Sequence, residues 1–152
     1  MTPEEISSFL ISTRDAAQLA AHIWPEYAAC EAALESAWGT SQLTLEAFNL
    51  FGRKQSTKFP LYSTLDLPTH EWINSEMIEV MAHWVKYPDL QSCFQDRMAT
   101  LRRLSPVYPE YAAALAAPDG ETFIVEVSKK WSSDPSRGTK VLAIYSAHKG
   151  AF

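Results

Sequence analysis

Apolar residues recur at helical spacing along most of this chain. The opening run Thr2–Glu5 supplies the cap, proline and glutamate of a helix start, and Ile6 and Phe9 then share one face. The helical recurrence of apolar residues is interrupted at residues 12–15. We therefore predict a break there, followed by a second helical stretch over residues 19–23.

A third helix is predicted from Pro25 to Gly39. Small alanine side chains form one face of it, which suits close packing against another helix, and Gly39 occupies a position where helices commonly end. Thr40 or Ser41 can cap a short following helix that reaches about Phe48.

The pattern changes between residues 58 and 85. Residues 59–62 have the composition of extended chain. Two apolar runs at 71–73 and 77–81 flank Asn74–Glu76, which predicts a β-hairpin with a short turn.

Helical spacing resumes after the hairpin. Four further helices are predicted: one led by Pro88 and Asp89 that runs to about Leu101, then Tyr111–Ala117, Phe123–Trp131, and a last one led by Asp134 and Pro135. The predicted fold class is mainly α with a small β-hairpin lobe, an α+β fold. We expect a single domain over residues 1–152, with the β-lobe at about 58–85.

Composition limits the partners. The 152 residues are 47% apolar and 20% charged, enough to build a core, and the net charge is −5. This acidic balance argues against binding to nucleic acid or attraction to anionic polymers and membranes, because both need a basic face. No run approaches the roughly 20 apolar residues of a membrane span, and the first residues do not resemble a secretory signal peptide. We therefore expect synthesis in the cytoplasm.

Cysteine and histidine give little sign of a metal site. Cys30 and Cys93 stand in apolar surroundings, which favours buried free thiols over a disulfide or a metal pair. His70 and Glu71 begin like a zinc-protease helix motif, but Asn74 stands where the second histidine ligand should be. We expect no metal and no cofactor.

Glu35 is the main candidate for chemistry. It falls in the last turn of the third predicted helix, where the negative end of the helix dipole disfavours a carboxylate. Trp38 at i+3 can shield it from water, and Glu31 at i−4 adds like charge. All three effects would raise the pKa of Glu35, which suits a general acid for a glycosidic leaving group. The alternative is an ordinary solvated glutamate on a helix surface.

The stretch Ala32–Gly39 followed by Asn49–Gly52 resembles the signature of glycoside hydrolase family 73. In that family a helix reading roughly A-L-E-S-G-W-G is followed by N-L-F-G-I-K; here Ala37 replaces the first glycine, and Arg53 and Lys54 follow Gly52. Members of the family are endo-β-N-acetylglucosaminidases that cut peptidoglycan. The resemblance implies a lysozyme-like fold, in which the substrate lies between a helical body and a β-lobe.

Three further stretches match the family more loosely. Thr69–Trp72 resembles its T-x-E motif, His83–Tyr87 occupies the place of F-R-x-Y, and Trp131–Pro135 resembles Y-A-T-D-P. Trp131 replaces the usual tyrosine of that last motif. An indole can stack on a sugar but has no phenolic hydroxyl to donate.

The resemblance assigns two catalytic and six substrate-binding residues. Glu35 is the acid and Glu71 the second carboxylate, and the substrate-binding set is Ser36, Trp38, Asn49, Tyr87, Trp131 and Asp134. Alternatives stay open for two of them: Glu71 as a surface residue of an exposed hairpin, and Asn49 as a residue whose amide only fixes the following turn. Glu31 and Glu79 are expected to be solvated.

The expected function is hydrolysis of the β-1,4 bond between N-acetylglucosamine and N-acetylmuramic acid in peptidoglycan glycan strands, by a monomer that needs no metal or nucleotide. The expected setting is a phage or prophage endolysin that reaches the wall through a holin or a secretion system. The rival functions are a muramidase or lytic transglycosylase, which cuts the other glycosidic bond, and a non-catalytic wall-binding or structural protein.

Overall fold

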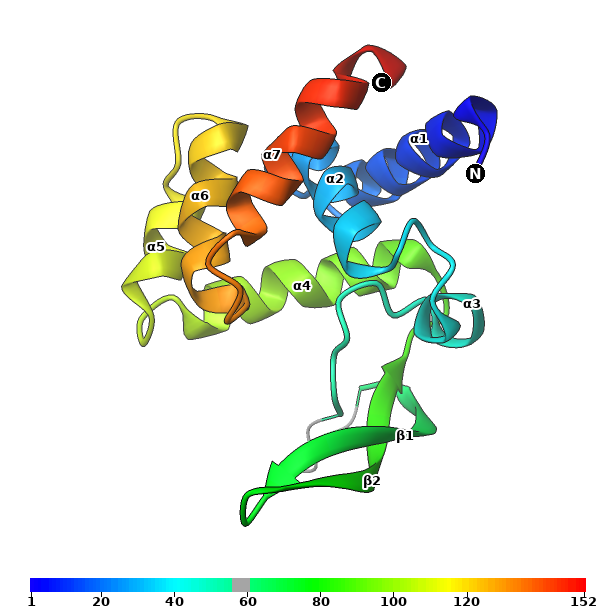
Figure 1. Cartoon of the computed structure of the whole chain (residues 1–152). Helices are drawn as coiled ribbons and strands as arrows, with labels where there is room; N and C mark the ends of the chain where they lie inside the picture. Colours follow the sequence, from blue (N-terminus) through cyan, green and yellow to red (C-terminus); the bar gives the residue numbers. More distant parts are fainter. Residues whose placement is uncertain (56–60) are drawn as a thin grey trace.

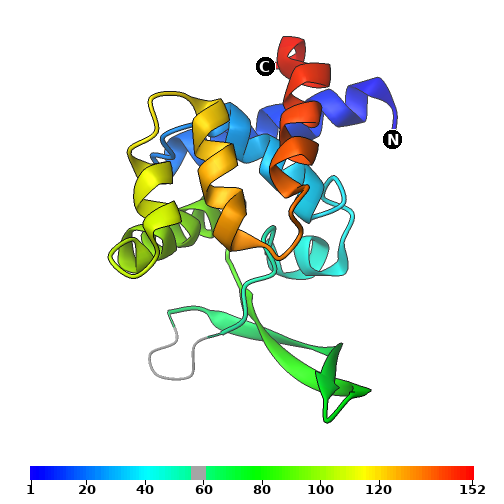
Figure 2. The ribbon, with the colours of Figure 1, turned by 60° about the vertical axis from the view of Figure 1, so that its left-hand side comes forward.

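The computed structural model describes residues 1–55 and 61–152. Its elements are, in chain order, α1 (Pro3–Leu19), α2 (Pro25–Glu35), α3 (Gln42–Ala47), β1 (Ser63–Ile73), β2 (Glu76–Lys86), α4 (Leu90–Leu104), α5 (Pro109–Leu115), α6 (Gly120–Trp131), α7 (Arg137–His148) and a final 3-10 turn at Lys149–Ala151. The helices form one body, from which the β1–β2 hairpin projects (Figures 1 and 2). The predicted class, mainly α with one β-hairpin, is confirmed.

Helix α1 is continuous. Its predicted start is confirmed by a capping box, in which the Thr2 hydroxyl accepts from the Glu5 amide and the Glu5 carboxylate accepts from the Thr2 amide. The predicted break at residues 12–15 is wrong. Thr13 is buried, and its hydroxyl donates to the Phe9 carbonyl at 2.7 Å, so the helix accommodates this polar residue without interruption.

Helix α2 ends at Glu35, earlier than the predicted end at Gly39. Ala37, Trp38 and Gly39 all have positive φ, of 49°, 59° and 78°. A Cβ on Gly39 would lie 2.7 Å from the Phe9 ring, so the close approach of α1 as well as the backbone conformation requires glycine there. The contact with Phe9, distant in the chain, explains why the local pattern misplaced the helix end.

The core surrounds α2. Its small-residue face is buried against neighbouring helices, as predicted. Cys30 and Cys93 are buried and free, which confirms that prediction, and burial raises the pKa of both thiols to about 12. They are therefore uncharged at neutral pH and behave as small apolar side chains.

The hairpin is longer than predicted, but its turn lies where the sequence places it. Asn74 and Ser75 form a two-residue turn with φ of 51° and 65°, and Ile73 pairs with Glu76 across it. The predicted lobe boundary at Lys58 and the extended residues 59–60 lie outside the described part of the chain.

The base of the hairpin is tied to the body through one asparagine. The Asn49 side-chain amide donates to the carbonyls of Arg53 and Val85, both at 2.9 Å, and its oxygen accepts from the Arg53 amide at 3.0 Å. The Val85 amide donates in turn to the Arg53 carbonyl, and the Tyr87 amide to the Ala47 carbonyl. These bonds fix the angle at which the hairpin leaves the body.

The later helices follow the sequence closely. Asp89 caps α4 as predicted, by accepting from the Ser92 amide. The last helix begins at Arg137, not at Pro135 as predicted, because the Asp134 carboxylate bonds to the amide and hydroxyl of Ser136 and holds a separate turn before it. None of the described helices is long and apolar enough to cross a bilayer.

Candidate active site

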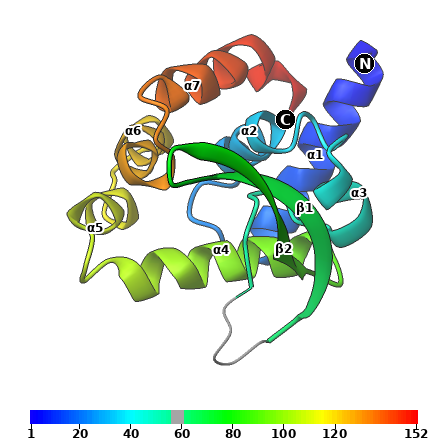
Figure 3. The same cartoon turned by 60° about the horizontal axis from the view of Figure 1, so that its bottom comes forward.

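The candidate site lies on the face of the helical body that the hairpin crosses (Figure 3). Helices α2 and α6 end at this face and α7 begins there, so Glu35, Trp131 and Arg137 are all at helix termini. The segment that leads from α3 toward the hairpin completes it. Residues far apart in the chain are thereby brought to one place.

Glu35 lies in the last turn of α2, as predicted, and is its last residue because the helix ends earlier than predicted. Its side chain is 25% exposed, and its Oε1 accepts from Arg137 Nε at 2.6 Å. Glu35 thus lies at the surface, as the surface-glutamate alternative holds, but its carboxylate is bound and not freely solvated. The carboxylate is a half-sheltered group held in place by a charge-assisted hydrogen bond.

Glu31 is fully buried, so its predicted solvation is wrong. Its Oε2 accepts from Arg97 Nη2 at 2.9 Å and from Arg137 Nη2 at 2.8 Å. Burial alone would raise the pKa of Glu31, but the two guanidinium groups hold this pKa at about 2. Glu31 is therefore ionised and neutralised, and its predicted action as an uncompensated like charge beside Glu35 is wrong.

Arg137 is a residue of this site that the sequence did not reveal. Its side chain is 2% exposed and donates to three acceptors: Glu35, Glu31, and the Ser128 hydroxyl at 2.8 Å. Burial lowers the pKa of this guanidinium, but the two carboxylates outweigh burial and the pKa is raised. No local motif could reveal the contact, because 102 positions separate Arg137 from Glu35 in the chain.

The i+3 spacing predicted that Trp38 shares a helix face with Glu35, and this prediction is wrong. The helix has already ended, and the positive φ of Trp38 directs its ring to Phe9 and His148, with centroid distances of 6.0 and 5.4 Å. The described ring contacts of Trp38 do not involve Glu35, and the shielding of Glu35 by this indole stays a prediction. A role for Trp38 in substrate binding stays a prediction.

Trp131 forms part of an aromatic wall. The guanidinium of Arg97 lies 3.9 Å from its ring centroid and 4.5 Å from that of Phe51, so a buried arginine contacts the faces of two rings whose planes meet at 85°. Both rings line a pocket of about 380 Å³, together with Gly52, Arg53, Lys54, Thr100, Leu104 and Tyr111. Trp131 thus stands where the resemblance placed it, at an open pocket, although its contact with substrate stays a prediction.

Glu71 lies on β1, within the hairpin. Its side chain is 45% exposed and accepts from Lys54 Nζ at 3.0 Å, and this ammonium also lies 5.5 Å from the Trp84 ring centroid. Among the described contacts, none joins Glu71 to Glu35. The two carboxylates belong to separate parts of the fold, the hairpin and the helical body.

Three predicted substrate-binding residues use their polar groups inside the protein. Ser36 is buried, and its hydroxyl donates to the Ala32 carbonyl and accepts from the Gly39 amide. Asn49 is buried at the base of the hairpin, as the turn-fixing alternative required. Tyr87 is buried too; its hydroxyl donates to Asp96, and burial and this bond raise its pKa. Their placement supports structural roles and gives no support to substrate binding.

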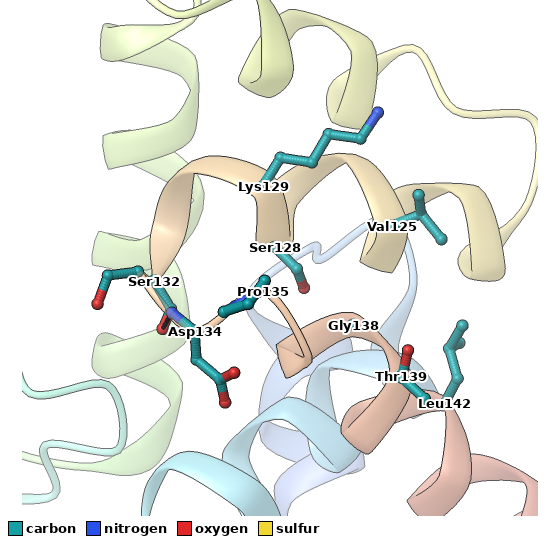
Figure 4. Close-up of a pocket in the computed structure, with 10 residues that line it drawn as sticks. Val125, Ser128, Lys129, Ser132, Asp134, Pro135, Gly138, Thr139 and Leu142 are labelled. Carbon is teal, nitrogen blue, oxygen red and sulfur yellow. Dashed lines mark hydrogen bonds between the residues drawn. The ribbon is translucent and has the colours of Figure 1, made fainter.

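Asp134 lines a different pocket, of about 500 Å³, between α6 and α7 (Figure 4). The Asp134 carboxylate accepts from Lys140 Nζ at 2.8 Å and from Ser136, and these bonds hold its pKa well below the usual range. Ser128 also lines this pocket and is the residue that Arg137 reaches. The pocket therefore adjoins the Glu35 site through Arg137.

One comparison decides the family. The sequence model of a family named Glucosaminidase, described as mannosyl-glycoprotein endo-beta-N-acetylglucosaminidase, matches residues 12–150. The chain belongs to the glucosaminidase family. The resemblance to glycoside hydrolase family 73 is thereby confirmed, and the chain is a glycoside hydrolase. No curated protein matches its sequence.

Solved structures share the fold of this glucosaminidase. The catalytic domain of the autolysin Auto from Listeria monocytogenes matches with 24% identity and a TM-score of 0.81, over 98% of this chain and 87% of that one. A C-terminally truncated glycoside hydrolase domain of Salmonella typhimurium FlgJ matches with 26% identity and a TM-score of 0.75, over 95% and 98%. A peptidoglycan hydrolase mutant from Sphingomonas sp. A1 matches with 22% identity and a TM-score of 0.74, over 95% and 97%. The expected lysozyme-like α+β fold is confirmed.

The candidate site offers an acid–base group in Glu35. In the part of the chain that the structure describes, no three His, Cys, Asp or Glu side chains are grouped to hold a metal ion. The carboxyl of Glu35 can exchange a proton with a glycosidic oxygen, which is the step that glycoside hydrolysis requires.

Proposed function

We propose that this glucosaminidase hydrolyses peptidoglycan and cuts the β-1,4 bond between N-acetylglucosamine and N-acetylmuramic acid. The observation that carries the proposal is that Arg137 fixes Glu35 at the end of α2, a helix that ends at the face that the hairpin crosses. The family supplies the reaction class. The autolysin and the peptidoglycan hydrolase that share the fold support the choice of substrate.

In the proposed reaction Glu35 enters as a carboxylic acid and protonates the glycosidic oxygen as the bond breaks. The leaving chain departs as an alcohol and Glu35 becomes a carboxylate, beside the Arg137 guanidinium that stabilises it. Positive charge develops at the anomeric carbon. Either Glu71, directly or through a water, or the substrate's own 2-acetamido group meets that charge. Water supplies the new hydroxyl at the anomeric carbon, and the proton that it gives up restores the acid form of Glu35.

The substitution Glu35→Gln tests the acid. It removes the proton and keeps the shape, so we expect at least about a 100-fold loss of kcat, the usual range for a general acid. The measurement is the rate at which purified walls gain new reducing ends that carry N-acetylglucosamine. Glu26→Gln is the matched control, because it removes a carboxylate from the first turn of the same helix.

The identity of the new reducing sugar tests bond specificity. N-acetylglucosamine supports the proposal; N-acetylmuramic acid, or its anhydro form, would replace it with a muramidase or a lytic transglycosylase. Binding to walls without any cleavage, in wild type and Glu35→Gln alike, would indicate a non-catalytic protein.

The substitution Glu71→Gln separates the two routes at the anomeric carbon. If the carboxylate serves as base or nucleophile, we expect kcat to fall by about 100-fold or more. If the 2-acetamido group serves, kcat stays within about tenfold of wild type, because Glu71 then contributes only charge. Glu79→Gln is the control, an exposed glutamate on the other strand of the hairpin.

The endolysin role stays a prediction. Expression in a bacterial cytoplasm with and without a co-expressed holin tests it. Lysis only with the holin is the expected outcome, and lysis without one would contradict this delivery route.

A further inference from the structure

We propose that Arg137 is the positioning residue of Glu35: its buried guanidinium holds the acid in the orientation that reaches the glycosidic oxygen. This inference rests on the proposed function, and it assigns a role to a residue that no motif of the sequence singled out. Four charged side chains on three helices are in contact here: Glu31, Glu35, Arg97 and Arg137.

One guanidinium holds two carboxylates of the same helix. Glu31 and Glu35 are four positions apart on α2, so they share a face, and Arg137 donates from Nη2 to Glu31 at 2.8 Å and from Nε to Glu35 at 2.6 Å. The fork of donors is planar and rigid, so the position of Glu31 dictates where Nε meets Glu35.

Glu31 is itself fixed from a second direction. Arg97 of α4 donates to the same oxygen of Glu31, and the Phe51 and Trp131 rings both contact this guanidinium. The two arginines balance the charges of Glu31 and Glu35, which makes the cluster tolerable inside the fold. A continuous series of contacts therefore runs from the aromatic pocket to the candidate acid.

Without Arg137, Glu35 would lose its anchor. A glutamate at a helix C-terminus has several free side-chain torsions, and without the Arg137 donor none of the described contacts would orient the Glu35 carboxyl. A displacement of about 1 Å at a reacting group costs on the order of 100-fold in rate, and the loss falls on kcat because glycan binding relies on other groups.

The test compares Arg137→Met, Arg137→Ala and Arg137→Lys with wild type. Purified walls are the substrate, and kcat and KM are expressed per folded molecule. Val141→Ala is the control for stability alone, because Val141 is buried on the same helix and its truncation weakens packing without removing a bond to Glu35. We expect kcat to fall by about 100-fold in the Met and Ala variants, with KM within about threefold of wild type.

Chemical rescue separates positioning from structural support. Guanidinium at concentrations far below those that unfold the protein should refill the space in Arg137→Ala and raise its kcat at least about tenfold. Equal concentrations of urea or sodium chloride should not do so, and guanidinium should not raise kcat of Val141→Ala. Arg137→Lys keeps a charge but not the fork, so its kcat should fall between those of wild type and Arg137→Met.

Wild-type kcat in any of the three variants, or no gain from guanidinium in Arg137→Ala, would overturn the inference. If Arg137→Ala and Arg137→Met do not fold, the Lys variant alone decides, because wild-type kcat there would show that the fork is not needed. Failure of the proposed function is a different result: wild type itself then releases no reducing N-acetylglucosamine.

Discussion

Ala37 lies two residues beyond the candidate acid in a backbone conformation that alanine rarely adopts, with φ of 49°. The family signature has glycine at this position, and the structure supplies the reason. A Cβ in the left-handed region costs on the order of 1–2 kcal/mol, whereas glycine adopts it freely.

We therefore expect Ala37→Gly to stabilise the protein. Relief of about 1–2 kcal/mol of strain outweighs the roughly 0.5–1 kcal/mol of extra unfolded-state entropy that glycine brings. Urea unfolding measures the change. Ala33→Gly, buried within α2, should destabilise by at least about 1 kcal/mol; a loss of stability in both variants would contradict the strain argument.

His22 is the second residue whose environment has a measurable consequence. Its Nδ1 accepts from the Trp24 amide at 3.0 Å, and its ring packs edge-on against Phe94 and Phe123. Burial lowers the pKa of His22 from 6.5 to about 4; nearby arginines lower it further and Glu31 opposes them. The folded protein therefore favours the neutral form of His22.

This shift makes stability depend on pH. Between pH 6.5 and about 4 the unfolded chain binds a proton at His22 that the folded protein does not bind, so stability falls as pH decreases through this range, by about 3 kcal/mol in all. Unfolding free energies between pH 7 and 4 measure the slope. His22→Asn should remove this part of the slope, because an asparagine oxygen can still accept from the Trp24 amide but does not titrate. An unchanged slope in His22→Asn would contradict the assignment of this pH dependence to His22.

At the scale of elements, the joint between hairpin and body depends on Asn49. The substitution Asn49→Ala removes the Asn49 partner of the Val85 carbonyl and of the Arg53 amide, and it leaves the Arg53 carbonyl with only the Val85 amide, so we expect a loss of about 2 kcal/mol. Thermal unfolding measures it. Asn74→Gly, at the exposed hairpin turn, should leave stability unchanged or raised because its φ is positive. Equal effects of the two substitutions would contradict a special role for Asn49.

The sequence predicted the elements better than their ends and better than the site. Helix starts such as Thr2 and Asp89 carry a signal within four residues, and the hairpin turn is equally local. The misplaced end of α2 depends on Phe9, and the setting of Glu35 depends on Arg137. Such contacts join distant parts of the chain, so no spacing rule detects them; a family motif finds the acid but not the group that holds it.

For the whole molecule, the net charge of −5 excludes attraction to the wall by bulk positive charge. Wall binding should therefore depend on local contacts and should not weaken between about 0.05 and 0.5 M salt, where the screening length falls from roughly 14 to 4 Å. Co-sedimentation of Glu35→Gln with purified walls measures binding without digestion. A steep loss of binding with salt would show that an undetected basic surface dominates recognition.

A small rotation at the base of the hairpin produces a larger displacement further along its strands. Glu71 lies eight positions along β1 from Ser63, up to about 26 Å from the base at the usual rise of a strand. A rotation of about five degrees at the base moves that carboxylate by roughly 2 Å, comparable with the difference in carboxylate spacing between retaining and inverting glycosidases. Wherever Glu71 takes part in the reaction, the mechanical stiffness of the joint at Asn49 thus helps to set the stereochemistry of the product.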